Sequence, residues 1–466
     1  MKMYGGYIMR LKSEKNSKNS NLMTEGNIFK ILVLFSIPLI LGNLLQQMYN
    51  TVDSIIVGNY VGSNALAAVG SSTSLIYLLI AFSQGASVGA GVVIAQAVGA
   101  KDDEGVSMAV HTSIFIAAIL GLALSILGFL FSSNILLWMQ TPQEVFEQSS
   151  IYLKLYSLGM VFNVVYNMLA GILNAVGNSK RSLLYLAIAS ITNIILDLLF
   201  IKVFQLGVVG AAVATDISQL VSCVFALLFL IRVSANYSVK LKAIKLHKKY
   251  ATRIVKLGLP TGIQNMVISL SNILVQSSVN VFGATVIAGF GAYMKIDGFN
   301  VLPVLSLSMA ITTFTGQNYG AGKMERVKKG MWITLLISFI YTVITGLLLL
   351  KFSHFVMGLF TNDNAVINSG ILAMKFFCPF YAMLGILQCF AGTIRGFGKT
   401  IPPMVVLLIS LCGFRIVWVK FIIPLYNTIE MVYVLYPISW AIGTVLIILY
   451  MFRANLLGGK KWSIQC

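Results

Sequence analysis

Charged side chains are scarce in this 466-residue chain: Asp, Glu, Lys and Arg make up 10% of it, whereas 58% of its residues are hydrophobic. Soluble domains have about 25% charged residues, so a soluble chain of this length could not cover its surface with so few. The composition therefore excludes a cytosolic enzyme, and the abundance of hydrophobic residues excludes a disordered chain. It predicts a membrane protein that crosses the bilayer many times.

Acidic residues are the scarcer of the two charge types. There are 14 Asp and Glu against 33 Lys and Arg, which gives a net charge of +19. In a soluble protein this excess would indicate nucleic acid or an acidic ligand as the partner. In a membrane protein it is also typical of cytoplasmic loops rich in Lys and Arg. The positions of the charges decide between these two interpretations.

Residues and motifs that form reactive centres are also few. The only cysteines and histidines are Cys223, Cys378, Cys389, Cys412, Cys466, His111, His247 and His354. Their spacing predicts neither a disulfide scaffold nor a metal centre. The chain has no GxxxxGK[ST], HExxH or GxSxG motif, so we expect no enzyme activity, no cofactor and no ATP binding. An ion gradient remains as the energy source for any transport.

Long hydrophobic runs, by contrast, fill most of the chain. A transmembrane helix needs about 20 apolar residues. Twelve such runs are expected, at about residues 30–57, 72–98, 106–133, 148–174, 182–204, 208–232, 255–282, 287–317, 330–352, 366–393, 402–424 and 431–453. Their hydrophobicity is continuous rather than alternating, which excludes a β-barrel. We therefore predict an all-α polytopic fold of twelve transmembrane helices.

The basic residues indicate which side of the membrane each loop faces. Residues 1–27 are polar and lack the apolar core of a signal peptide, so they are predicted to form a cytoplasmic tail. With this orientation, 26 of the 33 basic residues lie on the cytoplasmic side, and the outer loops hold only Lys202, Lys351 and Lys420. This asymmetry predicts cytoplasmic N- and C-termini and no nucleic acid partner. The basic stretch 240–256 is interpreted as a cytoplasmic loop, with anionic lipid binding as the alternative.

A shift of 221 residues brings two halves of the chain into register. The matching pairs include Gly62 with Gly283, Gln96 with Gln317, Lys154 with Lys375, Gly171 with Gly392 and, after one gap, Pro38 with Pro260. We predict an N-lobe at 28–232, a linker at 233–254, a C-lobe at 255–453 and a cytoplasmic tail at 454–466. Six helices per lobe preserve orientation, so the repeats are parallel, as in some secondary transporters.

Polar residues on two predicted helices of the N-lobe form a candidate cation site. Gln46, Asn50 and Asp53 share one face of the first helix, and Asn193 and Asp197 share one face of the fifth. Ionisable residues inside a membrane are costly and mark functional sites by default. Two carboxyl groups close together cannot both ionise cheaply, so they would hold a proton or bind a cation such as Na⁺. The alternative is that these groups only hold the helices together.

The sixth helix brings two further oxygen-bearing residues to this region. At about 1.5 Å per residue, Thr215 and Asp216 are predicted at a depth similar to that of Asp53 and Asp197, in the outer half of the membrane. Asp216 points about 100° away from Thr215 on the helix, so it either supports the cation site or serves packing.

The C-lobe repeats the scaffold but not this chemistry, because Asn193 and Asp197 fall on Phe414 and Trp418. A separate candidate polar site contains Lys295, Asp297 and Arg415. We expect Asp297 to form an ion pair with one of the bases Lys295, Lys375 and Arg415; contact with a substrate is the alternative.

Prolines occupy the first helix of each lobe, Pro38 in one and Pro260 in the other. A proline removes a backbone hydrogen bond and permits a kink. A kink next to Asp53 would couple the state of that carboxyl group to the shape of the helix, and a static kink is the alternative.

Several segments together resemble the multidrug and toxic compound extrusion (MATE) transporters, most closely their DinF-like branch. They are YNTVDSIIVG at 49–58, AQAVGA at 95–100, NIILDLLF at 193–200, GVVGAAVAT at 207–215 and RGFGKT at 395–400. The resemblance implies two V-shaped lobes and an N-lobe site for Na⁺ or H⁺ formed by Asp53, Asn193, Asp197 and Thr215. Another branch has carboxylates in helices 7 and 10, where this chain offers no acidic residue.

These observations predict a cation-coupled (Na⁺ or H⁺) multidrug efflux antiporter in the plasma membrane, which works by alternating access. The resemblance implies that its substrates are amphipathic, often cationic drugs. We expect it to be a monomer whose partners are small molecules and lipid. One alternative is a flippase of lipid-linked oligosaccharides or lipids; an alternative of another class is a structural membrane protein that transports nothing.

Overall fold

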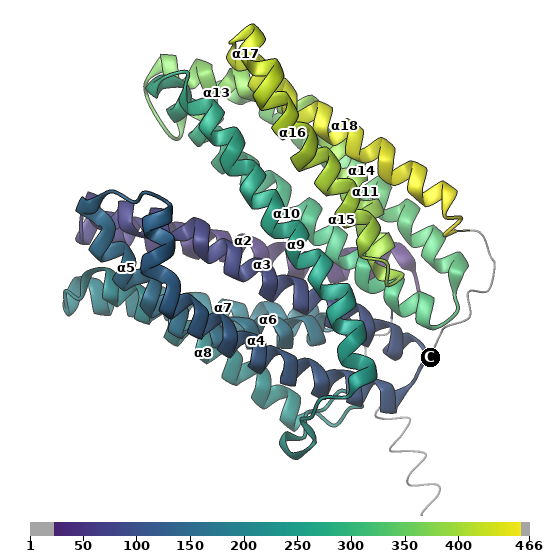
Figure 1. Ribbon diagram of the computed structural model, residues 1–466. Helices are drawn as coiled ribbons and strands as arrows, with labels where there is room; N and C mark the ends of the chain where they lie inside the picture. Colours follow the sequence, from purple (N-terminus) through teal and green to yellow (C-terminus); the bar gives the residue numbers. More distant parts are fainter. Residues whose placement is uncertain (1–22, 458–466) are drawn as a thin grey trace, which may run out of the picture. The chain divides into compact units, whose positions relative to one another are not determined.

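The computed structural model describes residues 23–457, and within this range it consists of helices and short connections without a β-strand (Figure 1). The predicted tails at 1–27 and 454–466 lie mostly outside the described residues. The helices of the first half are α2 (Ile28–Tyr60), α3 (Ser63–Gly99), α4 (Asp103–Trp138), α5 (Gln143–Leu158), α6 (Met160–Ala175), α7 (Ser179–Asp197), the π-helical segment η1 (Leu198–Val203) and α8 (Gly207–Arg232).

After a short 3₁₀ turn η2 (Leu241–Ala243), the second half follows the same plan. Its elements are α9 (Lys248–Asn280), α10 (Ala284–Gly320), α11 (Met324–Lys351), α12 (Ser353–Gly358), α13 (Asn364–Phe377), η3 (Cys378–Phe380), α14 (Tyr381–Gly396), α15 (Ile401–Leu407), η4 (Leu408–Gly413), α16 (Phe414–Val417), η5 (Trp418–Ile422), α17 (Ile423–Tyr426) and α18 (Ile429–Arg453). The segments η4 and η5 are π-helical. Each of the twelve predicted spans coincides with one continuous or interrupted helical run.

Most of these runs are long and apolar enough to cross a membrane. Ten helices of the described chain meet this condition, and the pair α5 and α6, bent by 47° at Gly159, raises the number to eleven. The remaining run, α9, has 33 residues, or about 50 Å of helix, but it falls outside this set. Gln264, Asn265 and Asn272 lower its hydrophobicity. The chain is therefore a multi-pass membrane protein whose seventh predicted span is the most polar.

The chain divides into two compact units. The first contains residues 34–265, and the second contains residues 26–33 together with residues from 266 onward. The division falls inside α9 rather than at the linker, so the first half of α9 groups with the first unit. Glycine makes this possible, because a Cβ on Gly89 would meet the α9 backbone at Gly258 at 2.6 Å. Each unit has its own hydrophobic core, formed by a different set of helices.

The two units share one packing plan. In the first, α6 packs against α3, α4 and α8; in the second, α14 packs against α10, α11 and α18. The correspondence extends to single hydrogen bonds: Ser87 Oγ donates to the carbonyl of Asn167 at 2.7 Å, and Ser308 Oγ donates to the carbonyl of Gln388 at 2.6 Å. Ser308 lies 221 residues after Ser87, and Gln388 lies 221 residues after Asn167. The structure therefore confirms the repeat.

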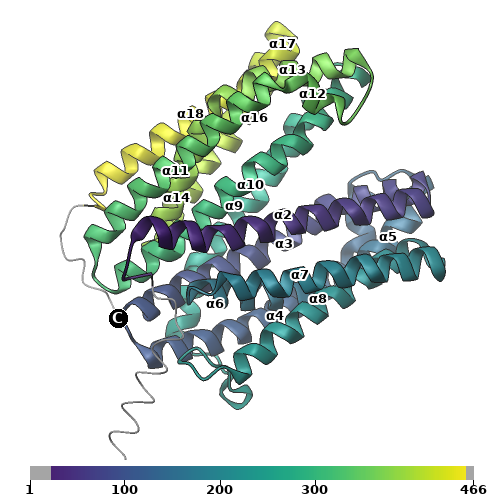
Figure 2. The ribbon, with the colours of Figure 1, turned by 180° about the vertical axis from the view of Figure 1, so that it is seen from behind.

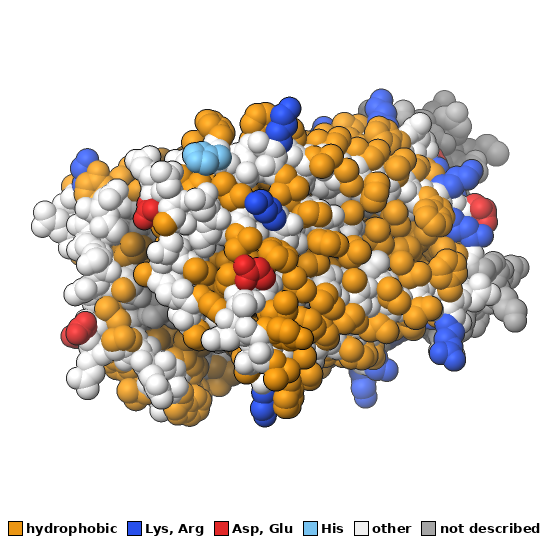
Figure 3. Space-filling view, turned by 90° about the horizontal axis from the view of Figure 1, so that it is seen from above, with side chains coloured by type: hydrophobic (Ala, Val, Ile, Leu, Met, Phe, Trp, Pro, Cys, Tyr) orange, Lys and Arg blue, Asp and Glu red, His pale blue; other side chains and the backbone are white. Residues whose placement is uncertain are grey.

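Hydrophobic side chains cover much of the face that Figure 3 shows. Large residues such as Trp138, Leu130 and Leu347 are more than half exposed although they lie on long helices. A soluble protein rarely leaves so large an apolar area open, but lipid tails solvate it well. The surface therefore agrees with the membrane location that the composition predicts.

Candidate functional site

The candidate cation site is built on a pair of buried carboxyl groups. Asp53 of α2 and Asp197 of α7 are 8% and 0% exposed, and their carboxyl groups lie next to each other. Oδ1 of Asp53 and both carboxylate oxygens of Asp197 are buried without a hydrogen-bond donor. Two carboxylates have no donor of their own, so this contact is stable only with a proton between them or a cation beside them.

Neighbouring residues on α7 and α8 add neutral oxygens. The Asn193 side chain donates through Nδ2 to Oγ1 of Thr215 at 3.4 Å, and the Thr215 hydroxyl donates to the carbonyl of Ala211 at 3.1 Å. Oδ1 of Asn193 is buried and has no partner. The structure thus brings the four predicted residues Asp53, Asn193, Asp197 and Thr215 together from three helices, and α2 and α7 lie side by side (Figure 2).

The backbone changes its winding directly after Asp197. Helix α7 ends at that residue and continues as the π-helical segment η1, whose wider turns shift the direction of the following side chains. π-Helical turns are uncommon and occur often at functional sites. The other unit has η5 at the equivalent position, where Trp418 replaces Asp197. The irregular backbone is thus common to both repeats, whereas the carboxyl group belongs to one.

Three tyrosines lie near the carboxyl pair; two of them are buried, and none was predicted as part of the site. Tyr49 lies beside Gln46 and Gln219 and within electrostatic reach of Asp53. Tyr152 and Tyr156 of α5 are almost fully buried and also lie within reach of Asp53. In the sequence, the i, i+4 spacing of Tyr152 and Tyr156 on an amphipathic stretch could have identified these two residues. These side chains reduce the access of water to the carboxyl groups.

Two of the predicted supporting residues have other surroundings. Asn50 is half-buried, and its backbone carbonyl accepts the hydroxyl of Ser54 at 2.9 Å. The Asp216 carboxylate accepts the backbone N–H of Gly159, at the bend between α5 and α6. Asp216 therefore satisfies a donor freed by the helix break. This contact matches the packing interpretation of Asp216.

The C-lobe polar site differs from the expectation. Asp297 forms no ion pair with Lys295, Lys375 or Arg415; the one salt bridge among residues 23–457 joins Lys328 and Glu325. The expected ion pair is therefore wrong.

Two tyrosine hydroxyls donate hydrogen bonds to Asp297 instead. Oδ1 of Asp297 accepts the hydroxyl of Tyr381 at 2.5 Å and that of Tyr293 at 3.4 Å. Lys295, only two residues from Asp297, points elsewhere on α10 and is exposed. Tyr293, four residues before Asp297, shares its helix face and was detectable from the sequence, whereas Tyr381 was not.

Arg415 is 3% exposed and also lacks an acidic partner. Its Nε and Nη2 donate to Oγ of Ser439, both at 3.3 Å, and its Nη1 donates to Oδ1 of Asn272 at 3.1 Å. The structure thus shows no ion pair among the three residues of the candidate C-lobe site, Lys295, Asp297 and Arg415.

Pro38 and Pro260 each lie inside a helix that continues on both sides, α2 and α9 respectively. Their effect on helix shape remains a prediction.

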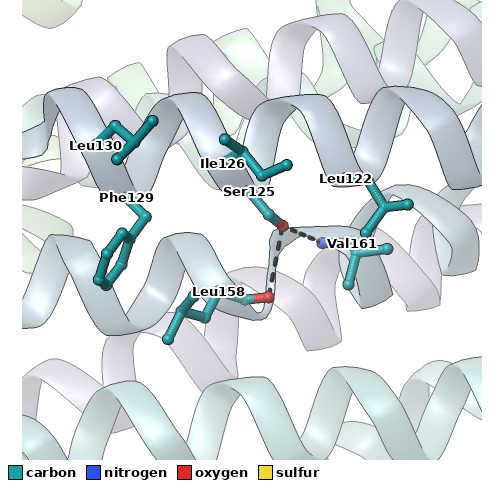
Figure 4. A pocket seen from close by; sticks show the side chains of 7 residues that line it. All are labelled: Leu122, Ser125, Ile126, Phe129, Leu130, Leu158 and Val161. Atoms are coloured by element: carbon teal, nitrogen blue, oxygen red, sulfur yellow. Dashed lines mark hydrogen bonds between the residues drawn. The ribbon is translucent and has the colours of Figure 1, made fainter.

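An apolar pocket of about 290 Å³ lies between α4 and the bend that joins α5 and α6 (Figure 4). Its one polar side chain is Ser125, which donates to the carbonyl of Leu158 at 3.4 Å and accepts the N–H of Val161 at 3.1 Å. The hydroxyl thereby bridges backbone groups on both sides of the helix break. The pocket offers no group that could bind an ion.

The donor set of the carboxyl pair suits a hard cation or a proton. Carboxylate, amide and hydroxyl oxygens are the ligands that such cations prefer. Within residues 23–457, no three His, Cys, Asp or Glu side chains form a group that could hold a metal ion. Asp53 and Asp197 are therefore assisted by neutral oxygens and not by a third acid.

Comparisons with known proteins identify relatives along nearly the whole chain. The MatE family model matches residues 38–199 and 260–419, one stretch in each repeat. The chain is 30% identical over 390 residues to the probable multidrug resistance protein YpnP of Bacillus subtilis, covering 83% of this chain and 86% of that protein. It is 29% identical over 447 residues to the probable multidrug resistance protein YoeA of the same organism, covering 94% and 95%.

A solved structure shows the same fold. A MOP superfamily transporter from Pyrococcus furiosus superposes with a TM-score of 0.86 at 24% identity, covering 94% of this chain and 98% of that chain. The likeness therefore extends over both repeats.

Proposed function

The chain belongs to the MatE family, and from this premise we propose that it is an antiporter that exports amphipathic, often cationic drugs in exchange for Na⁺ or H⁺. Membership makes it a transporter rather than an enzyme. The relatives named as probable multidrug resistance proteins support drugs as the substrate class. We further propose a plasma-membrane location, cytoplasmic termini, a monomeric state and no cofactor other than the coupling ion.

One observation carries the coupling proposal: Asp53 and Asp197 are buried side by side, with carboxylate oxygens that no donor reaches. A pair of bare carboxylates in this environment repels itself and has lost its hydration. A proton or Na⁺ removes both penalties. The pair therefore has a strong affinity for a cation, and a difference in that affinity between two conformations would couple the cation to transport.

The proposed cycle couples two ligands to two conformations. The cation binds at Asp53 and Asp197 while the site is open to the outside and favours return to the inward-open state. Drug entering from the cytoplasm or inner leaflet then favours the outward-open state. Each ligand shifts the equilibrium only by its difference in affinity for the two states. Loss of either carboxyl group should thus uncouple drug export from the ion gradient.

The test is drug flux in liposomes that contain the purified protein, with Na⁺ and pH gradients imposed separately. Asp53→Asn and Asp197→Asn keep the shape of the side chain but remove its charge. We expect each to reduce gradient-driven flux of an organic cation by about tenfold or more. The exposed Glu144 of α5 provides the matched control, since Glu144→Gln also removes one acid from the same lobe.

The two gradients separate the possible coupling ions. Flux driven by the Na⁺ gradient alone or by the pH gradient alone identifies the coupling ion. Wild-type flux that neither gradient changes would refute coupling. Asn193→Ala and Thr215→Val remove neutral ligands of the proposed site. They should weaken Na⁺-driven flux more than proton-driven flux, because a proton needs only the carboxyl pair.

A further inference from the structure

The C-lobe contains a buried positive charge that the cation-exchange mechanism does not use. Arg415 lies within the run α15 to α17, which is long and apolar enough to cross the membrane. All its partners are neutral: Ser439, Asn272 and the ring of Tyr436, whose centroid is 4.3 Å from the guanidinium carbon. A guanidinium has five N–H donors, and three are used here. Two donors therefore remain for a ligand.

Such an arrangement is unfavourable unless something compensates for it. A charged side chain inside a membrane is costly unless it is paired, and it marks a functional site by default. Two of the three hydrogen bonds of Arg415 are 3.3 Å long and go to one hydroxyl, so they are weak. A carboxylate, which accepts two parallel N–H bonds from a guanidinium, would satisfy the group far better.

The internal repeat shows where this charge lies relative to the cation site. Shifted by 221 residues, Thr215 falls on Tyr436 and Ile194, next to Asn193, falls on Arg415. With the one-residue gap that aligns Pro38 and Pro260, Asn50 falls on Asn272. The C-lobe thus places a guanidinium where the helices equivalent to α2, α7 and α8 meet. The N-lobe has its carboxyl pair on α2 and α7 and Thr215 on α8.

An acidic group and aromatic rings accompany Arg415 in the same unit. Asp297 and Arg415 both lie close enough to Tyr436 to act on its hydroxyl electrostatically. Tyr436 packs against Phe377 at 4.4 Å and Trp440 at 6.1 Å between ring centroids, and Trp440 stacks on Tyr381, which holds Asp297. Opposite charges therefore flank a set of aromatic rings without forming an ion pair.

We propose that Arg415 binds the carboxylate of a substrate, so that the C-lobe accepts zwitterions rather than simple cations. Asp297, which is partly exposed, attracts the amine or ammonium end, and the buried rings between the two charges keep water away from both. Access to the guanidinium lies beside Asn272, whose side chain is exposed and accepts Nη1. This inference rests on the proposed transport function, since it names the substrate class of that function.

The test compares two dyes that differ by one group. Rhodamine B carries a free carboxylate, and rhodamine B ethyl ester has the same aromatic cation with that carboxylate esterified. Binding to the purified full-length protein in detergent is measured by fluorescence anisotropy. We expect Arg415→Gln to weaken the binding of rhodamine B by about tenfold or more and to change ester binding by less than about twofold. Arg415→Lys should recover part of the loss, since lysine restores the positive charge but not the two parallel N–H donors of the guanidinium.

Two further variants exclude a purely structural effect. Lys375→Gln removes an exposed base from the same lobe and should change neither affinity. Asn272→Asp places a competing carboxylate 3.1 Å from Nη1 and should weaken rhodamine B alone, even if Arg415→Gln does not fold.

Equal losses for both dyes, no loss for either, or no rhodamine B binding by the wild type would each overturn the proposal. Gradient-driven flux of the ester in liposomes tests the transport function separately. Absent flux with the expected binding pattern would refute transport and leave the assignment of Arg415 as an anion-binding group intact.

Discussion

Asp216 shows how one residue can resemble a site residue and have another role. Its carboxylate accepts the N–H of Gly159, the residue at which α5 and α6 meet at 47°. Helix α6 begins there with unsatisfied N–H groups, and a negative charge at a helix N-terminus is favourable. Ser125 bridges the other side of the same break. Asp216 and Ser125 therefore hold a bend in the fourth predicted span, next to the tyrosines that enclose Asp53.

We predict opposite outcomes for two substitutions at this bend. Asp216→Asn keeps an acceptor oxygen toward Gly159 and should retain drug flux and most of the thermal stability. Gly159→Ala adds a methyl group that would overlap the Asp216 carboxylate. Such overpacking costs about 1–3 kcal/mol, so Gly159→Ala should lower the melting temperature in detergent by several degrees. If Asp216→Asn abolished flux at unchanged stability, the packing role would be refuted.

The segment between α8 and α9 is held against the first unit at several points. His111 of α4 accepts the backbone N–H of Lys240 through Nε2 at 3.0 Å, with its Nδ1 2.7 Å from the carbonyl of Ser107. The next residue, Thr112, accepts the backbone N–H of His247 at 3.2 Å. Tyr237 is buried, and burial raises the pKa of its hydroxyl. The segment is therefore packed against α4 and is not a free linker.

Removal of the His111 imidazole should loosen this segment locally. We predict that His111→Ala speeds hydrogen exchange at the Lys240 amide by about three- to tenfold, the loss expected for one hydrogen bond. Exchange in α18, which belongs to the other unit, should not change. The matched control is His354→Ala, since His354 is exposed near the start of α12. Unchanged exchange at Lys240 would show that the contact contributes nothing to the docking.

At the scale of the whole chain, the duplicated scaffold carries unlike chemistry. Element bounds, packing partners and even the Ser87 and Ser308 hydrogen bonds recur in both repeats. The N-lobe has Asp197 where the C-lobe has Trp418, and the C-lobe has Arg415 where the N-lobe has Ile194. A duplicated fold constrains the backbone, whereas side chains at one position can differ freely. The duplicated fold is therefore compatible with the proposed division of cation coupling and substrate recognition between the two units.

The orientation of the whole chain can be tested with a membrane-impermeant maleimide. In a Cys466→Ser background the remaining cysteines, Cys223, Cys378, Cys389 and Cys412, are buried. We expect Lys351→Cys to react in intact cells, because Lys351 is exposed on the predicted outer side. Lys245→Cys should react only in inside-out vesicles. The reverse pattern would overturn the predicted topology.

Composition and periodicity by themselves determined the membrane class, the twelve helical runs and the repeat, because these depend on local properties that recur along the chain. They also predicted that Asp53 and Asp197 lie at one depth, since helical rise converts residue number into distance. Only the tertiary structure decided which groups satisfy each charge. Tyr381 reaches Asp297 across 84 residues, Gly159 interrupts a run that hydropathy shows as continuous, and Arg415 has no acid beside it. Such contacts depend on how helix faces rotate and pack against one another, and hydrophobicity along one helix does not specify its neighbours.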